Sequence, residues 1–417
     1  MDSEFTAFCQ GLGLSSEDAR IIKDKLDEST TYQNTLDVAS TTAKLALGED
    51  RVIPPTNKAV VNVNWSLACV AEPHCIIQPE DAQDVSKVMK IVKHFKIRFA
   101  VRSGGHSPNP GWSSVESTGV LIDLQRLNQV VLSSDKALAS LGPGGRWGEV
   151  IKTLDNQGAT VIGARGPGVG VAGTILGGGL FHLTEFGLGA DNVKNFEVVL
   201  ADGTIINANS EQNSDLFWAL KGGGPNFGVV TRFDLYTVPV REVWYNVLAY
   251  SPDQAPEVID AFVQYQKGGG SSDVKTTASL IMGIDTVLLL LVYGASQPHQ
   301  GTFEPFYDVK PYQVIVPAIT GTFSSLTDVF ALVDTVEPMR HDYRGISTRI
   351  DAQLDKEVYK FWREKALAVR EATGANQIFS LQPISANVAI QGIAKGGNPM
   401  GIPQEDHQCK EPSQLVE

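Results

Sequence analysis

Residues 102–107 read Arg-Ser-Gly-Gly-His-Ser and follow directly on the short apolar run Phe-Ala-Val at 99–101. Two adjacent glycines, Gly104 and Gly105, let the backbone fold tightly, so that several N–H groups can point at one anion. A histidine one residue further on, His106, would lie close to whatever that anion carries. The segment therefore predicts a phosphate-binding turn. The alternative is a plain glycine turn with an incidental histidine.

The surroundings of this turn predict a strand–helix–strand unit. Residues 75–77 (Cys-Ile-Ile) form a short apolar run, and 79–81 (Pro-Glu-Asp) are typical of a helix start. The apolar positions of 85–92 recur at helical spacing, and 98–101 make the next strand. The turn at 102–107 would then stand at the end of a strand, where unpaired N–H groups can meet a phosphate.

Size and charge bound the class of protein. A chain of 417 residues is long enough for two domains with their own cores. A net charge of −13 argues against a nucleic-acid partner and against an anionic membrane surface. The N-terminal residues resemble no signal peptide and no apolar run is long enough to span a bilayer, so we expect a cytoplasmic protein.

Cysteine usage gives no sign of a metal centre. The four cysteines, Cys9, Cys69, Cys75 and Cys409, contain no CxxC pair, so we predict no zinc or other metal site. Cys69 and Cys75 are near enough in sequence to form a disulfide, but a cytoplasmic location favours free thiols. Nothing in the sequence indicates an oligomeric state.

The pattern along the chain predicts an α+β protein with two domains. Residues 1–65 form a helical lead-in, with Ser15 as an expected N-cap. From 66 to 240, short strands alternate with glycine-rich joints and two helices, at 146–157 and 214–220. From 241 to 417, longer strands and helices indicate an antiparallel sheet covered by helices. The expected strands there are 244–250, 277–282 and 286–293, and the expected helices are 256–266 and 354–370.

Two further glycine-rich segments lie in the middle region. Residues 168–173 (Gly-Val-Gly-Val-Ala-Gly) match GxGxxG, but the three glycines at 177–179 should break the helix that a dinucleotide-binding motif must open. We therefore interpret 168–179 as an irregular strip where backbone approaches a flat ligand closely. Residues 221–230 repeat this pattern at a strand edge, with Gly228 expected to be closely packed.

Six blocks in order resemble one family. They are SGGHS at 103–107, GPGGRWGEV at 142–150, GVGVAGTILGGG at 168–179, DNV at 191–193, VVLADG at 198–203 and NSDLFWALKGGGPNFGVVT at 213–231. Together they resemble FAD-linked oxidoreductases of the vanillyl-alcohol oxidase / p-cresol methylhydroxylase type, more narrowly the fungal berberine bridge enzyme-like ones. The resemblance is dense over about 65–240 and looser at 394–402 (AKGGNPMGI). It implies a two-domain FAD-binding fold with an antiparallel-sheet substrate domain.

The resemblance also implies roles for individual residues. Arg102, Ser103, Gly104, Gly105, His106 and Ser107 would hold the FAD pyrophosphate, and His106 would carry a covalent bond to the 8α-methyl carbon of the flavin. Members with a second bond have a cysteine near 165–168, where this chain has Arg-Gly-Pro-Gly, so a single link is implied. The residues expected to line the flavin are Val169, Gly170, Gly173, Gly177, Gly178 and Val229.

The activity implied is FAD-dependent oxidation of a small organic molecule, with hydride transfer to the flavin and reoxidation by molecular oxygen. A biosynthetic intermediate of secondary metabolism is the expected substrate. The alternatives are a carbohydrate (oligosaccharide) oxidase and a flavin scaffold that catalyses a cyclisation such as a Diels–Alder reaction without net redox turnover.

One departure concerns the C-terminal region. The family usually has a YxNY-type tyrosine segment and a KYDP-like terminus, and neither occurs before Glu417. A shortened, inactive product is therefore a further alternative. His182, Tyr343 and Tyr359 are candidate bases, but each has an expected structural role, so we assign no catalytic base.

Overall fold

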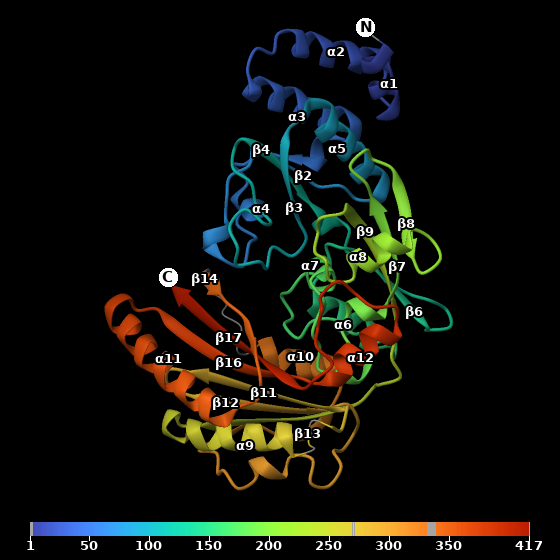
Figure 1. The fold of residues 1–417 in the computed structure, drawn as a ribbon. Helices are drawn as coiled ribbons and strands as arrows, with labels where there is room; N and C mark the ends of the chain where they lie inside the picture. Colours follow the sequence, from blue (N-terminus) through green and yellow to red (C-terminus); the bar gives the residue numbers. More distant parts are fainter. Residues whose placement is uncertain (1–2, 269, 271, 332–338, 417) are drawn as a thin grey trace. The chain divides into compact units, whose positions relative to one another are not determined.

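The computed structural model describes residues 3–268, 270, 272–331 and 339–416 and divides the chain into two compact units. Unit 1 comprises Met1–Val150, Gly168–Gly177 and Val193–Tyr236. Unit 2 comprises Ile151–Pro167, Gly178–Asn192 and Thr237–Glu417. Figure 1 shows the elements of both units in their chain order.

The N-terminal region of unit 1 is helical. The helices are α1 (Ser3–Gly11), α2 (Ser16–Asp27), α3 (Tyr32–Leu47) and the single turn α4 (Lys58–Val61). Ser15 caps α2 as expected, in a capping box with Asp18. Ile22 of α2 is fully buried, and α1 and α3 pack against α5 (Ala82–Phe95) (Figure 1). The lead-in thus shares one hydrophobic core with the strand–helix–strand unit.

The predicted strand–helix–strand unit is confirmed. Its strands are β1 (Val52–Ile53), β2 (Cys75–Ile77), β3 (Arg98–Arg102) and β4 (Gly119–Asp123). The sheet order is β1-β2-β4-β3, and both β2 and β3 run parallel to β4, which lies between them. The segment 103–107 follows β3 directly, at its carboxyl end.

A second sheet of unit 1 is antiparallel, in the order β5-β6-β9-β7-β8. Its strands are β5 (Val130–Leu132), β6 (Leu138–Leu141), β7 (Val193–Val199), β8 (Ile205–Asn209) and β9 (Val229–Tyr236). β7 and β8 pair with each other as an antiparallel hairpin. Gly228 precedes β9 with φ +152°, and a Cβ there would stand 2.7 Å from Val198 Cγ1, so its close packing is also confirmed.

The expected helices of this region are α6 (Trp147–Asp155) and α8 (Ser214–Leu220). The prediction that 168–179 forms no helix is wrong, because α7 spans Val171–Leu176. The glycines at 177–179 end the helix rather than prevent it, since α7 has six residues and Gly177 is its C-cap. In the described chain the element directly before α7 is the helix α6 and not a strand. Gly170 makes only an isolated bridge to Arg146, so the strand–turn–helix of a dinucleotide-binding motif is not formed.

Unit 2 contains the predicted antiparallel sheet covered by helices. Its order is β13-β10-β12-β11-β16-β17-β14, with β15 paired to β17. The strands are β10 (Val243–Tyr250), β11 (Thr276–Gly283), β12 (Val287–Tyr293), β13 (Gln313–Gly321), β14 (Arg340–Tyr343), β15 (Ile346–Thr348), β16 (Asn376–Ile384) and β17 (His407–Val416). The helices are α9 (Ala255–Lys267), α10 (Phe323–Ala331), α11 (Ala352–Thr373) and α12 (Ala386–Ala394). One face of the sheet shares a hydrophobic core with α9 and α11.

The units differ from the continuous ranges 66–240 and 241–417 expected from composition. The segments 151–167 and 178–192 belong to unit 2. Their polar contacts explain this assignment. Thr160 donates to the Val240 carbonyl at 2.6 Å, and Asn387 of α12 donates to the Thr184 carbonyl at 2.9 Å. These segments are tied to unit 2 by contacts that composition does not reveal.

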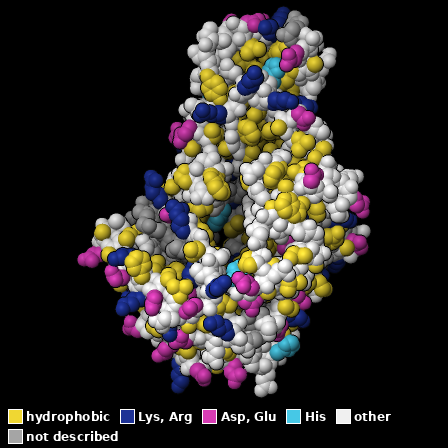
Figure 2. Space-filling view, in the orientation of Figure 1, with side chains coloured by type: hydrophobic (Ala, Val, Ile, Leu, Met, Phe, Trp, Pro, Cys, Tyr) yellow, Lys and Arg dark blue, Asp and Glu magenta, His cyan; other side chains and the backbone are white. Residues whose placement is uncertain are grey.

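Other general expectations concern thiols, surface charge and membrane segments. All four cysteines are free thiols, as predicted. On the face of unit 2 seen in Figure 2, acidic and basic side chains are interspersed. Within the described ranges, no helix is both long and apolar enough to cross a membrane.

Candidate functional site

The segment after β3 forms a tight turn with free amide donors. Gly105 has φ +63°, a conformation that favours glycine, and its carbonyl accepts from the Trp65 amide at 3.0 Å. The backbone N–H groups of residues 103–107 donate to no oxygen in the part of the chain that the structure describes. Buried or half-buried amides need an acceptor. The turn therefore has the donors that a phosphate group requires.

This turn packs backbone to backbone against the second glycine segment. A Cβ on Gly104 would lie 2.5 Å from both the Cα and the N of Gly170, so neither position has room for a side chain. Ser103 Oγ donates to the Pro143 carbonyl at 2.5 Å. Arg146 donates through Nη1 to the Gly104 carbonyl and, at 2.8 Å, to the Gly168 carbonyl. Three of the glycine-bearing blocks, at 103–107, 142–150 and 168–179, thus meet at one place in unit 1.

Arg102 has a structural rather than a ligand-binding side chain. Its guanidinium is buried and donates to Asp123 Oδ2 at 3.0 Å and to Asn64 Oδ1 at 3.2 Å. It also donates to the Val60 and Val61 carbonyls, at 2.6 and 3.2 Å. Because Asp123 neutralises it, the side chain fixes the start of the turn and leaves phosphate binding to the backbone.

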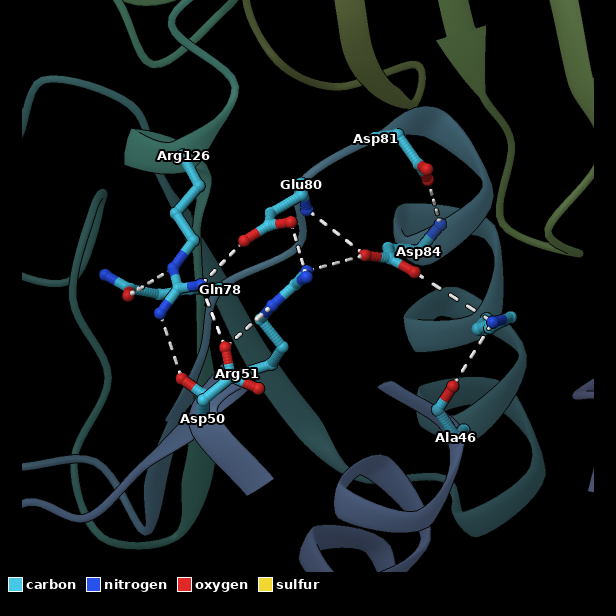
Figure 3. Close-up of polar contacts among 9 residues, drawn as sticks. Ala46, Asp50, Arg51, Gln78, Glu80, Asp81, Asp84 and Arg126 are labelled. Atoms are coloured by element: carbon cyan, nitrogen blue, oxygen red, sulfur yellow. Dashed lines mark hydrogen bonds and ion pairs between the residues drawn. The ribbon is translucent and has the colours of Figure 1, made fainter. Parts of the chain in front are cut away.

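The same carboxylate connects this arrangement to a surface network. Gln78 donates to Asp123 Oδ2 at 3.0 Å and accepts from Arg126 Nε at 3.2 Å. Figure 3 shows Arg126 between Glu80, at 2.7 Å, and Asp50, at 3.2 Å. Exposed pairs of this kind are worth little individually. Their arrangement nevertheless joins the segment before β1 to the end of β2.

His106 is held as a neutral, stacked imidazole. Its ring stacks on Trp65, with 4.4 Å between centroids and 11° between planes. Burial lowers the pKa of His106 to about 4, and the cation of Arg146 acts in the same direction. At neutral pH the ring is therefore uncharged, with a nitrogen lone pair free for bond formation.

Part of the segment predicted to line a flat ligand lies on α7. Gly173 and Gly177 are both exposed and stand one helical turn apart, with the Gly177 amide donating to the Gly173 carbonyl at 3.1 Å. Val169 is half-buried, and its carbonyl accepts from the Trp147 amide at 3.0 Å. Gly170 lies against the turn as described above. Gly173 and Gly177 thus leave a helix surface without side chains, and it follows closely in sequence on Gly170, which contacts the turn.

Two residues expected to line the flavin have other roles in packing. Gly178, in unit 2, has φ +108°, and a Cβ there would stand 2.8 Å from Met400 Sδ. The side chain of Val229 belongs to the hydrophobic core of unit 1, together with that of Val199. Internal packing therefore accounts for both residues, and only their backbone remains available to a ligand.

The three candidate bases lie apart from the turn in the sequence and belong to unit 2. His182 is buried with Nδ1 lacking an acceptor or donor in the described chain, and its ring lies 5.1 Å from that of Phe330. Burial lowers the pKa of His182 well below its usual value, with the Arg165 cation adding to the effect. Tyr359 is in the core and donates to the Pro252 carbonyl at 3.3 Å. Tyr343 ends the edge strand β14.

The segment 394–402 acts as an internal anchor of unit 2. Lys395 donates to the Phe186 carbonyl at 2.7 Å and to Asn192 Oδ1 at 2.8 Å. Asn398 donates to Asp191 Oδ1 at 2.9 Å. Asp191 and Asn192 of the DNV block are therefore in direct contact with this distant segment.

Sequence patterns did not single out Trp65 or Arg146, although both contact the turn. Arg146 stands in the GPGGRWGEV block, so its motif was visible while its contacts with two glycine carbonyls were not. Trp65 is 41 residues before its stacking partner His106, and no spacing rule connects them.

Comparison with known proteins agrees with this geometry. The model of an FAD binding domain matches residues 73–209. An FAD-dependent monooxygenase of Arthrobotrys oligospora is 38% identical over 353 residues, which cover 84% of this chain and 68% of the relative. The FAD-dependent monooxygenase macF of Penicillium terrestre is 33% identical over 360 residues, with the same two coverages.

Solved structures share the fold at lower identity. Xylooligosaccharide oxidase from Myceliophthora thermophila has a TM-score of 0.75 at 19% identity, covering 92% of this chain and 83% of its own. Berberine bridge enzyme from Eschscholzia californica has a TM-score of 0.70 at 18% identity, covering 87% and 75%. These likenesses concern the fold alone.

Proposed function

The chain belongs to a family of FAD-linked oxidoreductases that includes fungal FAD-dependent monooxygenases, and from this premise we propose that it oxidises a small organic molecule of secondary metabolism. The two relatives described above, 38% and 33% identical, are fungal FAD-dependent monooxygenases by name. The observation that carries the proposal is the turn at 103–107, whose free amides stand beside a neutral histidine.

The residues of unit 1 fit FAD as follows. The amides of Ser103, Gly104, Gly105, His106 and Ser107 would hold the pyrophosphate, since they have no acceptor among the described residues. Gly173 and Gly177 on the exposed surface of α7 would leave room for a flat ring, because they carry no side chains. When bound, FAD would supply the hydride acceptor and pass the electrons to oxygen.

His106 would hold FAD through the single covalent link, and FAD itself would supply the two-electron oxidation that replacing one hydrogen of the 8α-methyl group requires. An imidazole can bond to the 8α carbon only through an unprotonated nitrogen, and the pKa of about 4 keeps His106 unprotonated at physiological pH. Stacking on Trp65 fixes the plane of the ring, so that the nitrogen is presented in one direction.

The link is tested by absorbance of the purified protein before and after acid precipitation. We expect yellow colour that remains with the pellet, and colour released to the supernatant in His106→Ala. His299→Ala, which changes an exposed histidine of unit 2, is the control and should keep its colour in the pellet. Colour in the supernatant of the parent protein refutes the covalent link, and a colourless protein refutes the flavoenzyme proposal.

The names of the relatives favour a second candidate, insertion of one oxygen atom into the substrate. Such a reaction needs two electrons from a separate donor, because the other oxygen atom leaves as water, whereas a dehydrogenation takes its electrons from the substrate itself. Anaerobic mixing with NADPH distinguishes the two. Rapid bleaching of the bound flavin supports oxygen insertion, and no bleaching supports substrate dehydrogenation. Oligosaccharide oxidation and redox-neutral cyclisation stay as alternatives, with structural neighbours of the first kind supporting it by fold alone.

A further inference from the structure

The sheet of unit 2 has one apolar face and one face with polar groups. Alternate residues of β11 and β16 belong to the core beneath α9 and α11, namely Ala278, Leu280, Met282, Phe379 and Leu381. Because successive strand residues point to opposite faces, Ser279 and Gln382 belong to the other face. Because Leu280 pairs with Leu381, Ser279 and Gln382 lie opposite each other on the two strands. Ser279 Oγ donates to Gln382 Oε1 at 2.7 Å.

Arg165 approaches this polar pair with one end of its guanidinium. Nη1 donates to Gln382 Oε1 and, at 3.3 Å, to Ser279 Oγ. Ser279 and Gln382 are buried at 5% and 2% exposure, so they hold the guanidinium in a defined position. Both partners are neutral, so they orient the cation without neutralising it.

The charge of Arg165 has no counter-ion among the described residues. No carboxylate there forms an ion pair with it, and neither Nε nor Nη2 has an acceptor. The buried cations Arg102 and Lys410 each have an aspartate, at 3.0 and 2.6 Å. Arg165 is half-buried and already partly desolvated, so a ligand carrying a negative charge would pair with it at a smaller desolvation cost than with a fully exposed arginine.

The free donors also specify the shape of the anion. Nε and Nη2 lie side by side on the planar guanidinium and make the two parallel hydrogen bonds that a carboxylate accepts. We propose that Arg165 binds the carboxylate of the substrate, so that the substrate class is an organic acid; this inference rests on the proposed function. His182 adds no competing charge, because burial and the Arg165 cation keep its imidazole neutral.

Chain connectivity relates Arg165 to the flavin strip. Arg165 is three residues before Gly168, whose carbonyl accepts from Arg146 beside the turn. Three residues of extended chain span at most about 11 Å between Cα atoms. Covalent structure alone therefore keeps the Cα of Arg165 within about 11 Å of the Cα of Gly168.

The test is calorimetric titration of the purified holoprotein with benzoate and with benzamide, which has the same shape and no charge. We expect benzoate to bind at least about 10-fold more tightly than benzamide, as charge-assisted hydrogen bonds would give. Arg165→Gln should weaken benzoate about 10- to 100-fold and leave benzamide unchanged. Arg165→Lys should fall between, since it keeps the charge but loses the side-on pair of donors.

Two further variants separate binding from folding. Gln382→Glu leaves Arg165 in place and supplies an internal carboxylate, so it should abolish the preference for benzoate while the protein stays folded. Arg370→Gln removes an exposed arginine of unit 2 that pairs with Asp285, and should change nothing. Benzoate binding unchanged in both Arg165→Gln and Gln382→Glu overturns the proposal, as does equal binding of the two probes.

The outcome is distinguishable from that of the flavoenzyme proposal. A protein without FAD that binds benzoate through Arg165 supports the anion site and refutes the proposed function. A protein with FAD that does not prefer benzoate refutes the anion site and leaves the proposed function standing.

Discussion

Replacing Gly173 with alanine should make unit 1 more stable and make its FAD site weaker. Gly173 lies in α7 with φ outside the left-handed region, and a Cβ there would meet no atom within 4 Å. The substitution therefore has no internal steric cost. Alanine is better than glycine in a helix by about 0.8–1 kcal/mol. For a domain of roughly 150–250 residues this corresponds to a melting temperature higher by about 2–4 °C.

The effect on FAD has the opposite sign. If the ring lies on the exposed strip of Gly173 and Gly177, the new methyl group occupies space that the ligand needs. Overpacking of one methyl typically costs about 1–3 kcal/mol. The affinity for FAD should then fall about 5- to 150-fold.

The assay uses the His106→Ala background, in which FAD binding should be reversible. Flavin-free protein is melted to obtain stability and titrated with FAD, following flavin fluorescence. Gly11→Ala is the matched control: Gly11 ends α1, its added Cβ would also meet nothing within 4 Å, and FAD affinity should not change. An unchanged FAD affinity in Gly173→Ala, with the expected gain in stability, would show that this strip does not face FAD.

Three other substitutions or conditions test the structure more briefly. Asp355→Asn should destabilise unit 2 by about 3–5 kcal/mol in urea denaturation, because it leaves the buried ammonium of Lys410, 2.6 Å away, without a counter-ion; a loss below about 1 kcal/mol would contradict this. Asp123→Asn should have a similar cost in unit 1 and should also lower flavin content, since Arg102 at the start of the turn loses its anion; normal flavin content would show that the turn does not depend on this pair. The pKa of His106 is about 4 in the folded protein and near 6.5 in the unfolded protein, so the unfolded state binds the proton more readily. The free energy of unfolding of flavin-free protein should therefore fall by about 3 kcal/mol as the pH falls from 6.5 to 4. His106→Gln should lack that loss, and parallel pH profiles of the two proteins would refute the assignment.

Local patterns predicted the elements well where one residue's chemistry sets the boundary. Ser15 accepts from the Asp18 amide and starts α2, and Asp81 does the same for α5. Three strands of unit 2, at 244–250, 277–282 and 286–293, were predicted because they are long and largely apolar runs, whereas the other strands of its sheet were not predicted. In α7, by contrast, helix propensity argued against a helix that tertiary contacts of Val171 and Ile175 stabilise, both of them buried.

The candidate site was predictable in its backbone and less so in its side chains. The glycines at 104 and 170 were recognisable because only glycine allows the approach that the structure shows. Whether Arg102 faces a ligand or Asp123 depends on a residue 21 positions away, and a linear pattern does not carry that information. The same holds for Arg165, whose partners Ser279 and Gln382 come from two distant strands.

The interleaved course of the chain has a consequence for protein engineering. The chain changes unit after Val150, Pro167, Gly177, Asn192 and Tyr236, so each unit is assembled from three separate stretches. A chimera that exchanges everything after one cut near 240 would leave 151–167 and 178–192 from one parent against the sheet of another. Substrate specificity is therefore best transferred between relatives by exchanging all three stretches of unit 2 together, Arg165 included.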